Sequence, residues 1–398
     1  MSQFDTDLVI VGGCGHVGLP LGIVFAAQGA QVVLYDVNKA AVDQVNDAVL
    51  PFDEPGAAEV LTRVVGTGAL QASNDRNEIS RAEHVIIVIG TPVDEHLNPD
   101  LFAVPQAVEA LADSLVDGQV LILRSTIYPG VTALVEQLVE RLGLDIDVAF
   151  CPERIAEGKA MTELEALPQL VSARTDRAFR RAEGLFGRIA SDLVRLAPEE
   201  AELAKLFTNS YRYIKFAIAN QFYMVANEYG LDYERIRGAL THEYPRAADL
   251  PGAGFAAGPC LFKDTMQLAA FNNNNFTLGH SSMLINEGLP LYLVSQADDR
   301  YGLADKTVGI LGMAFKGDSD DARSSLSYKL KRILRFRSRE VLCTDPHVTT
   351  DDQLVPLDDV LARCDLLFVG APHSAYRELQ PTQPVVDVWN LFGNGVTT

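Results

Sequence analysis

The chain has 398 residues, of which 48% are apolar and 22% are charged. It is too long for one hydrophobic core of the usual size, so we expect two or three domains. The formal net charge of −20 argues against nucleic acid or an anionic membrane as a partner, because the summed field repels phosphate.

The five cysteines are widely spaced, and no two of them form a CxxC pair. This pattern is typical of a reduced, cytoplasmic protein without a structural metal site. Residues 8–27 are largely apolar, but Asp5 and Asp7 stand where a signal peptide carries positive charge, and five glycines interrupt the stretch. We therefore expect neither export nor a membrane span.

The N-terminal segment predicts a dinucleotide site. A strand, DLVIVGG, leads into a small-residue helix, and Gly13, Gly15 and Gly18 form GxGxxG between them. Gly13 would permit the tight turn, Gly15 the approach of a pyrophosphate, and Gly18 close packing of helix on strand. A second strand ends in Asp36, where a carboxylate can accept the ribose hydroxyls of NAD. The alternative is a turn that needs glycine only for packing.

The next strands end in loops with polar side chains. In HVIIVIGTPVDE the predicted strand leads to Thr91 and Pro92, and in VLILRSTIYPG it leads to Ser125 and Thr126. In a doubly wound sheet, ligands bind outside the carboxyl ends of the strands, so these residues would line the cofactor's other half. Hydroxyls after a strand are otherwise ordinary turn residues.

The strand IDVAF leads into CPERIAEGKA, which places Glu153, Arg154 and Glu157 at the same predicted edge. Three charged residues after an apolar strand form either part of a binding site or a solvated loop.

Residues 199–228 predict one long helix that begins after Pro198 and ends before Gly230. Its apolar residues recur at helical spacing and predict one buried stripe, made of Leu203, Phe207, Ile214, Ile218, Phe222 and Val225. The opposite side is polar, with Lys205, Asn209, Arg212 and Asn220. At about 45 Å, the helix could join two domains and form a dimer seam. The alternative is a bundle helix with a solvated face.

A glycine-rich stretch, GAGFAAGPCLFKD, places Lys263 and Asp264 within about one turn after Cys260. Most cysteines are small buried side chains of the core. A thiol in a glycine-rich loop, beside a cation and a carboxylate, fits an activated nucleophile better.

The C-terminal part predicts a second α/β unit, in which Lys316 and Arg323 flank a helix start and suggest a second anion site. The expected fold is α/β, with two Rossmann-like doubly wound domains joined by a long central helix and a helical dimerisation region. The expected domains are residues 1–198 for NAD, 199–300 for dimerisation and the cysteine loop, and 301–398 for a UDP-sugar.

Seven ordered motifs carry a family resemblance over nearly the whole chain: GCGHVGLPL, GTPVDE, STIYPG, PERIAEGKA, AELAKLFTNSYR, GPCLFKD and FKGDSDDARSS. Through them the chain resembles nucleotide-sugar 6-dehydrogenases of the UDP-glucose/GDP-mannose dehydrogenase family, which includes UDP-N-acetylmannosamine dehydrogenases. The resemblance implies oxidation of a sugar C6 alcohol to a carboxylate with two NAD. It also implies a nucleotide-sugar substrate, most simply a UDP-hexose, and a homodimer or higher homo-oligomer.

The resemblance assigns catalytic roles as well. Cys260 matches the thiol that attacks the aldehyde, giving a thiohemiacetal and then a thioester. Lys205 and Asn209 match the pair that stabilises charge on the C6 oxygen. The groups that position water and move protons match Asp264, Glu157 and Thr126.

The implied NAD-binding residues are Gly13, Gly15, His16, Val17, Gly18, Asp36, Thr91, Pro92, Ser125, Thr126 and Arg323. The implied substrate-binding residues are Glu153, Arg154, Lys205, Asn209, Arg246, Phe255, Gly258, Phe315 and Lys316, with Arg246 reaching the neighbouring subunit's substrate.

The sequence departs from the family pattern before the cysteine, where Ala256, Ala257 and Pro259 stand in GAGFAAGPC. The departure leaves the sugar open. There are two alternative functions: a two-electron β-hydroxyacid or 6-phosphogluconate-type dehydrogenase, which needs neither the thiol nor residues 305–390, and a catalytically silent NAD-binding module.

Overall fold

The computed structural model describes residues 3–91, 93–94 and 99–396. By its internal contacts the chain divides into two compact units, residues 1–207 and residues 208–398. The division falls inside a helix, whereas the sequence placed the domain boundaries at 198/199 and 300/301, which stay predictions.

The first unit contains a sheet of eight strands in the order β3-β2-β1-β4-β5-β6-β7-β8. All neighbouring strands are parallel except β6 and β7, which are antiparallel. The first six positions have the strand order of a dinucleotide-binding fold. The strands are β1 (Thr6–Val11), β2 (Val32–Tyr35), β3 (Leu70–Ser73), β4 (Ala82–Ile87), β5 (Val120–Leu123), β6 (Asp147–Phe150), β7 (Gln169–Ala173) and β8 (Leu193–Leu196).

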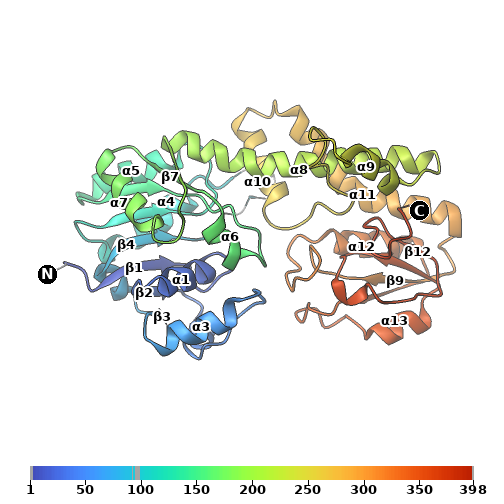
Figure 1. Cartoon of the computed structure of the whole chain (residues 1–398), viewed down its shortest axis with the longest axis horizontal. Coiled ribbons are helices and arrows are strands. Elements are labelled where there is room, and N and C mark those ends of the chain that lie inside the picture. The colour runs from blue at the N-terminus through green and yellow to red at the C-terminus, as the bar shows by residue number, and fades with distance from the viewer. Residues whose placement is uncertain (1–2, 92, 95–98, 397–398) are drawn as a thin grey trace. The chain divides into compact units, whose positions relative to one another are not determined.

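Helices cover both faces of this sheet (Figure 1). Alternate residues of β1 belong to different cores: Leu8 and Ile10 pack with residues of α1, α3 and α7, whereas Val9 and Val11 pack with residues of α4 and α5. Burial on both faces explains the continuous apolar runs of the strands. The helices are α1 (Gly18–Ala27), α2 (Lys39–Asn46), α3 (Ala57–Gly66), η1 (Arg76–Arg81), α4 (Ala103–Ala110), η2 (Ala112–Ser114), α5 (Val131–Leu142), α6 (Ala160–Ala166) and α7 (Asp176–Phe186).

The predicted long helix is confirmed as α8 (Pro198–Glu228), but its predicted orientation is wrong. Phe207, Ile218, Phe222 and Val225 are exposed, at 42–53% of their accessible surface. Three residues of the predicted polar stripe are buried instead, namely Lys205, Asn209 and Asn220. Two further polar residues of the helix, Glu202 and Ser210, are buried as well.

Internal hydrogen bonds make this orientation possible, since a buried polar group is stable only when it is bonded. Asn220 exchanges two hydrogen bonds with the backbone of Gly254 and donates a third to Asn286. Of the predicted polar residues, only Arg212 faces solvent.

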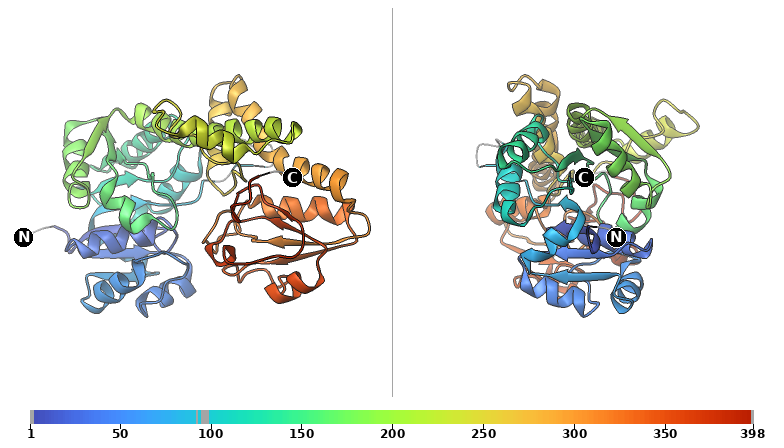
Figure 2. Two further views of the ribbon diagram at one scale, coloured as in Figure 1. Left: turned by 45° about the vertical axis from the view of Figure 1, so that its right-hand side comes forward. Right: turned by 90° about the vertical axis from the view of Figure 1, so that its left-hand side faces the viewer.

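The second unit contains a four-stranded parallel sheet in the order β10-β9-β11-β12. Helix α12 packs on one face and α13 on the other, as Figures 1 and 2 show. Residues of α8, α9 and α11 belong to the same core as α12. The elements are α9 (Tyr233–Thr241), α10 (Leu261–Phe271), α11 (Thr277–Tyr301), β9 (Thr307–Leu311), α12 (Leu326–Arg337), β10 (Glu340–Thr344), α13 (Leu357–Arg363), β11 (Leu366–Val369), η3 (Ser374–Tyr376) and β12 (Val385–Val386).

The predicted fold class is therefore confirmed: each unit contains a Rossmann-like sheet covered by helices, and one long helix spans the junction. Within the described ranges, no helix is long and apolar enough to cross a membrane.

Candidate active site

The glycine-rich turn after β1 is built by close backbone contacts. Gly12 has φ +77°, and a Cβ there would lie 2.0 Å from the carbonyl oxygen of Val88. Gly13 does not have a positive φ, but a Cβ there would lie 2.8 Å from the Cα of Leu34 in β2. The tight turn assigned to Gly13 therefore depends on Gly12, and Gly13 is needed for packing against β2.

The rest of the loop has room for a ligand. A Cβ on Gly15 would come no closer than 3.8 Å to its nearest neighbour, the Gly12 oxygen, whereas one on Gly18 would come within 2.7 Å of that oxygen. The N-cap of α1 is Val17, whose side chain offers no hydrogen-bond acceptor to the first turn. Open space beside uncapped helical N–H groups suits a pyrophosphate.

Asp36 lies at the end of β2 beside this loop. Its carboxylate accepts hydrogen bonds from the backbone N–H groups of Cys14 at 3.0 Å and Asn38 at 2.9 Å, and it remains partly exposed. A carboxylate oxygen has more than one acceptor site, so these bonds leave capacity for ribose hydroxyls. The loop and Asp36 together fit NAD.

Ser125 and Thr91 connect the ends of neighbouring strands. Ser125 Oγ accepts from the Ile89 N–H and donates to the Ile89 oxygen, both at 2.8 Å. Thr91 Oγ1 donates to the Thr126 oxygen at 2.7 Å. These bonds hold the two loops together at the carboxyl edge of the sheet. Pro92 lies outside the described residues.

Glu153 is buried in a network that the sequence did not predict. It pairs with Arg124, which is 1% exposed, and its other oxygen accepts the N–H groups of Arg154 and Ile155. The Arg154 guanidinium donates to the Pro168 oxygen. These contacts favour a supporting role for Glu153 under the PERIAEGKA loop, and its contact with substrate stays a prediction.

Glu157 lies on the same loop and approaches the glycine-rich turn. Its carboxylate is 3.6 Å from Nδ1 of His16, whose ring packs against Phe52 with centroids 4.0 Å apart. The structure therefore brings Glu157 to the predicted NAD loop.

Two predicted catalytic residues of the second unit are in direct contact. Asn209 Nδ2 donates to Asp264 Oδ2 at 2.5 Å, and Asp264 is completely buried, with Lys263 Nζ 3.3 Å from its other oxygen. Lys205 lies one turn before Asn209 on α8 and is also buried. An ammonium and a carboxamide at this spacing share one helix face.

Cys260 is the N-cap of α10 and is exposed. The four other cysteines are buried, and burial raises the pKa of Cys14 and Cys151 to about 12 and that of Cys343 and Cys364 to about 11. A helix N-terminus stabilises negative charge on an atom placed there. Cys260 is therefore the thiol best placed to react.

The loop before Cys260 is fixed by close contacts at its glycines. Gly254 has φ +151°, and a Cβ there would lie 2.4 Å from the Trp389 ring. Gly258 has φ +97°, and a Cβ there would lie 2.7 Å from the Phe315 ring. Phe255 is buried against Trp389, with ring centroids 6.0 Å apart. The cysteine loop thus packs directly on the loop that follows β9.

The remaining predicted residues are cations of the second unit. Lys316 Nζ lies 5.6 Å from the Phe315 ring centroid. Arg323 makes a bidentate pair with Asp321, so its predicted contact with NAD would compete with that carboxylate. Arg246 is exposed and lies 5.8 Å from the Tyr244 ring centroid.

A curated relative shows which family this arrangement represents. UDP-N-acetyl-D-mannosamine dehydrogenase of Pyrococcus horikoshii is 31% identical over 385 residues, which cover 93% of this chain and 90% of that protein. The chain belongs to the UDP-glucose/GDP-mannose dehydrogenase family. The family's NAD binding domain matches residues 7–190, its central domain residues 199–287, and its UDP binding domain residues 309–394.

Solved structures of this family have the same fold. A UDP-D-ManNAc dehydrogenase from P. horikoshii has a TM-score of 0.90 at 26% identity, covering 98% of this chain and 97% of that chain. A UDP-glucose dehydrogenase from Pyrobaculum islandicum has a TM-score of 0.89 at 26% identity, and the match covers 99% of this chain and 97% of that chain. As a family member, the protein is an NAD-dependent nucleotide-sugar dehydrogenase.

Proposed function

We propose that this dehydrogenase oxidises the C6 primary alcohol of a UDP-linked hexose to the carboxylate, with two NAD consumed per substrate. The observation that carries the proposal is the arrangement around α10: an exposed Cys260 at the helix N-terminus, with Asp264 one turn later, buried and bonded to Asn209. A two-electron dehydrogenase has no use for the thiol.

The name of the curated relatives favours one sugar. The relatives at 28–31% identity are called UDP-N-acetyl-D-mannosamine dehydrogenase, and UDP-N-acetyl-D-mannosamine is therefore our first choice of substrate. We assign UDP recognition to residues 301–398 and NAD binding to residues 1–198.

In the first oxidation, Lys205 and Asn209 hold the C6 oxygen and stabilise negative charge on it as the proton leaves. Bound NAD supplies a hydride acceptor in each of the two oxidations. Asp264, Glu157 and Thr126 position a water molecule that carries the alcohol proton away. The product of this step is the C6 aldehyde.

In the second oxidation, the Cys260 thiolate adds to the aldehyde carbon, and the carbonyl oxygen becomes an oxyanion held by Lys205 and Asn209. Loss of hydride from this thiohemiacetal gives a thioester on Cys260. Water, activated by Asp264 or Glu157, then breaks the carbon–sulfur bond, which releases the carboxylate and regenerates the thiol.

The remaining assignments concern binding and follow the family motifs. We assign the nucleotide sugar to Glu153, Arg154, Phe255, Gly258, Phe315 and Lys316, and the neighbour's substrate to Arg246. We assign NAD to Gly13, Gly15, His16, Val17, Gly18, Asp36, Thr91, Pro92, Ser125, Thr126 and Arg323.

Substrate choice can be tested by thermal shift and turnover with a panel of UDP-, GDP- and dTDP-sugars. A ligand that binds only the folded protein raises its unfolding temperature. We expect UDP-N-acetyl-D-mannosamine to give the largest shift and NADH production, with UDP alone shifting less. Turnover of a GDP-sugar or a small β-hydroxyacid without turnover of any UDP-sugar would contradict the proposal.

A further inference from the structure

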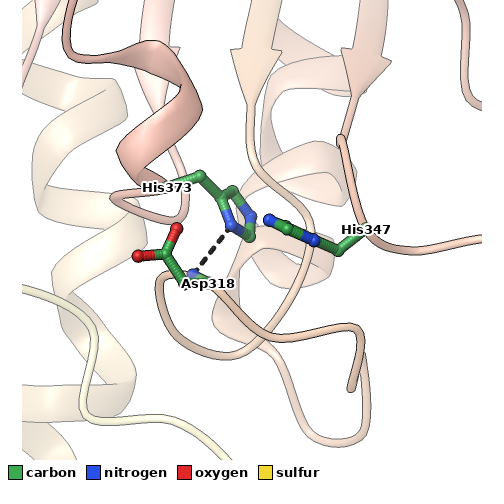
Figure 3. Close-up of side chains that lie close together, drawn as sticks. All are labelled: Asp318, His347 and His373. Carbon is green, nitrogen blue, oxygen red and sulfur yellow. Dashed lines mark hydrogen bonds between the residues drawn. The ribbon is translucent and has the colours of Figure 1, made fainter. Parts of the chain in front are cut away.

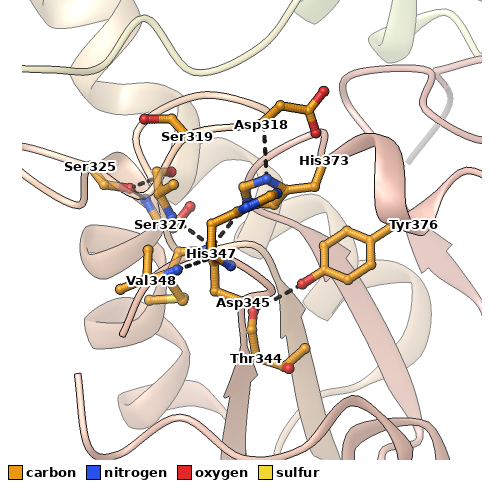
Figure 4. A network of polar contacts seen from close by, with 12 residues as sticks. Asp318, Ser319, Ser325, Ser327, Thr344, Asp345, His347, Val348, His373 and Tyr376 are labelled. Carbon is orange, nitrogen blue, oxygen red and sulfur yellow. Dashed lines mark hydrogen bonds and ion pairs between the residues drawn. The ribbon is translucent and has the colours of Figure 1, made fainter. Parts of the chain in front are cut away.

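A buried carboxylate at the end of β10 organises the loops on one edge of the second sheet (Figure 4). Asp345 Oδ2 accepts the N–H groups of Met313 at 2.6 Å and Ala314 at 2.9 Å. Its Oδ1 accepts the N–H groups of His347 at 2.8 Å and Val348 at 2.9 Å. Burial by itself raises the pKa of Asp345, but the bond from His373 and those from the Val348 and His347 N–H groups hold it well below its ordinary value.

His373 completes this network and is fully buried. Its Nδ1 accepts the N–H of Asp318 at 3.0 Å (Figure 3), so the ring proton must be on Nε2. This Nε2 lies 3.0 Å from Asp345 Oδ2 (Figure 4). The imidazole therefore donates to Asp345 and accepts from Asp318. It ties the Asp318 end of the loop of residues 313–318 to Asp345, which itself holds the Met313 end.

Asp318, His347 and His373 also place one possible metal ligand each within 4.8 Å of one another (Figure 3). A metal on His373 would have to displace one of its two hydrogen bonds, and the Asp318 carboxylate already accepts from the N–H and hydroxyl of Ser374. The contacts favour a hydrogen-bonded network over a metal centre.

The loop held by this network supports the cysteine loop. Phe315 contacts Gly258 so closely that a Cβ there would lie 2.7 Å from its ring, and Gly258 stands two residues before Cys260. Lys316 follows Phe315 directly. A shift of Met313 and Ala314 would therefore move both Lys316 and the surface on which the cysteine loop packs.

The corresponding carboxylate of the first sheet has a different environment. Asp36 also follows the second strand of its sheet and also accepts an N–H from the loop after the first strand, but it is partly exposed. The Asp345 carboxylate has five donors and its side chain has no exposed surface, so it cannot act as a ribose acceptor. Its role is confined to the loops that it holds.

We propose that Asp345 and His373 are positioning residues: they fix the loop of residues 313–318, and through it the placement of Lys316 and the reactivity of Cys260. The part that concerns substrate rests on the proposed function, whereas the part that concerns Cys260 reactivity does not.

Three variants at one position separate the two bonds of His373. His373→Ala removes both, His373→Asn keeps an acceptor near the Nδ1 position, and His373→Gln keeps a donor near the Nε2 position. Asp365→Asn is the matched control, because Asp365 accepts the N–H of Thr307 at 2.8 Å at the other end of β9. Circular dichroism and unfolding temperature report whether each variant folds.

The readouts are the KM for the UDP-sugar, the NAD dissociation constant, and the rate of Cys260 alkylation by iodoacetamide without substrate. For His373→Ala we expect KM to rise about tenfold, kcat to fall less, and the alkylation rate to change about threefold or more, since small displacements of reactive groups have large effects. NAD affinity should stay within about twofold, as should all readouts for Asp365→Asn. His373→Gln and His373→Asn should each recover part of the loss.

A folded His373→Ala protein with wild-type KM and alkylation rate would overturn the proposal. If the alanine variant does not fold, wild-type readouts in both conservative variants would overturn it, and altered ones would support it. A Zn²⁺-dependent alkylation rate that His347→Ala abolishes would also overturn it, in favour of a metal site. A different result would contradict the proposed function, namely undiminished acid formation by Cys260→Ala. The alkylation rates of the His373 variants would still test the positioning role in that case.

Discussion

At the scale of single residues, exposure distinguishes Cys260 from the four other cysteines, which are buried and have raised pKa values. Only a thiolate reacts quickly with iodoacetamide. We expect one equivalent of label on the native protein, located at Cys260 by peptide mass spectrometry. Native Cys260→Ala should stay unlabelled over the same time, and five labels should appear after unfolding of the wild type. Rapid labelling of Cys14 in the native protein would contradict this assignment.

The lowered pKa of Asp345 predicts a specific pH dependence of the unfolding free energy. Its pKa is lowered in the folded state from an ordinary value of 3.8, so its ionised form stabilises the fold above that pH, and this contribution is lost as the pH falls through the folded value. The unfolding free energy of wild type should therefore exceed that of Asp345→Asn by a constant amount near neutral pH and by less below about pH 4. Urea titrations at several pH values measure the difference. A difference that grows on acidification would contradict the inferred bonding.

Some of these residues could be predicted because their signals are local. Lys205 and Asn209 lie one turn apart, and helical spacing alone places them on one face. The Asp264 partner of Asn209 could not be predicted from spacing, since it is 55 residues away. Asp345 and His373 had no local signal either, because their network joins three separate loops, which follow β9, β10 and β11.

At the scale of elements, α8 shows why an apolar stripe does not identify a buried face. Phe222 and Val225 have helical spacing and are exposed, whereas the polar residues on the other side find hydrogen-bond partners inside the protein. The strand–glycine–helix start of the first sheet was predictable because turn chemistry is local. The last two strands of that sheet, β7 and β8, were not predicted as strands, and their sequences QLVSA and LVRL are short.

Glu202 connects α8 to the start of α5. It is completely buried, and its carboxylate accepts the N–H groups of Gly130 at 2.7 Å and Thr132 at 2.9 Å, as well as the Thr132 hydroxyl. Glu202→Gln puts amide hydrogens where an acceptor is needed, so we expect unfolding free energy to fall by about 2 kcal/mol. Chemical denaturation measures this loss.

The matched control for that variant is Glu199→Gln, one turn earlier. Glu199 is about half exposed and pairs with Arg174 at the surface, so its loss should cost less than about 0.5 kcal/mol. Equal losses in the two variants would show that Glu202 is not the anchor of α8 on α5.

At the scale of the whole molecule, the exposed face of α8 is the basis for a proposed homodimer. The helix has an apolar face toward solvent, as an interface requires, made of Phe207, Ile218, Phe222 and Val225.

If Arg246 completes the neighbour's site, mixing Arg246→Ala and Lys205→Ala chains should restore activity, because half of the sites in hybrid dimers are intact. Light scattering should show a dimer that Phe222→Glu weakens. A monomer at assay concentration, or mixed chains no more active than either variant, would contradict shared sites.

In the proposed reaction, Cys260 carries the second oxidation by covalent attack on the aldehyde. The most direct test is the ratio of NADH to sugar acid formed by wild type and by Cys260→Ala, with intact-protein mass of Cys260→Ser after incubation with substrate and NAD. We expect two NADH per acid in wild type and slow aldehyde formation with almost no acid from Cys260→Ala. We also expect an ester adduct on Cys260→Ser, because its hydroxyl adds but leaves poorly. Unimpaired acid formation by Cys260→Ala would contradict it.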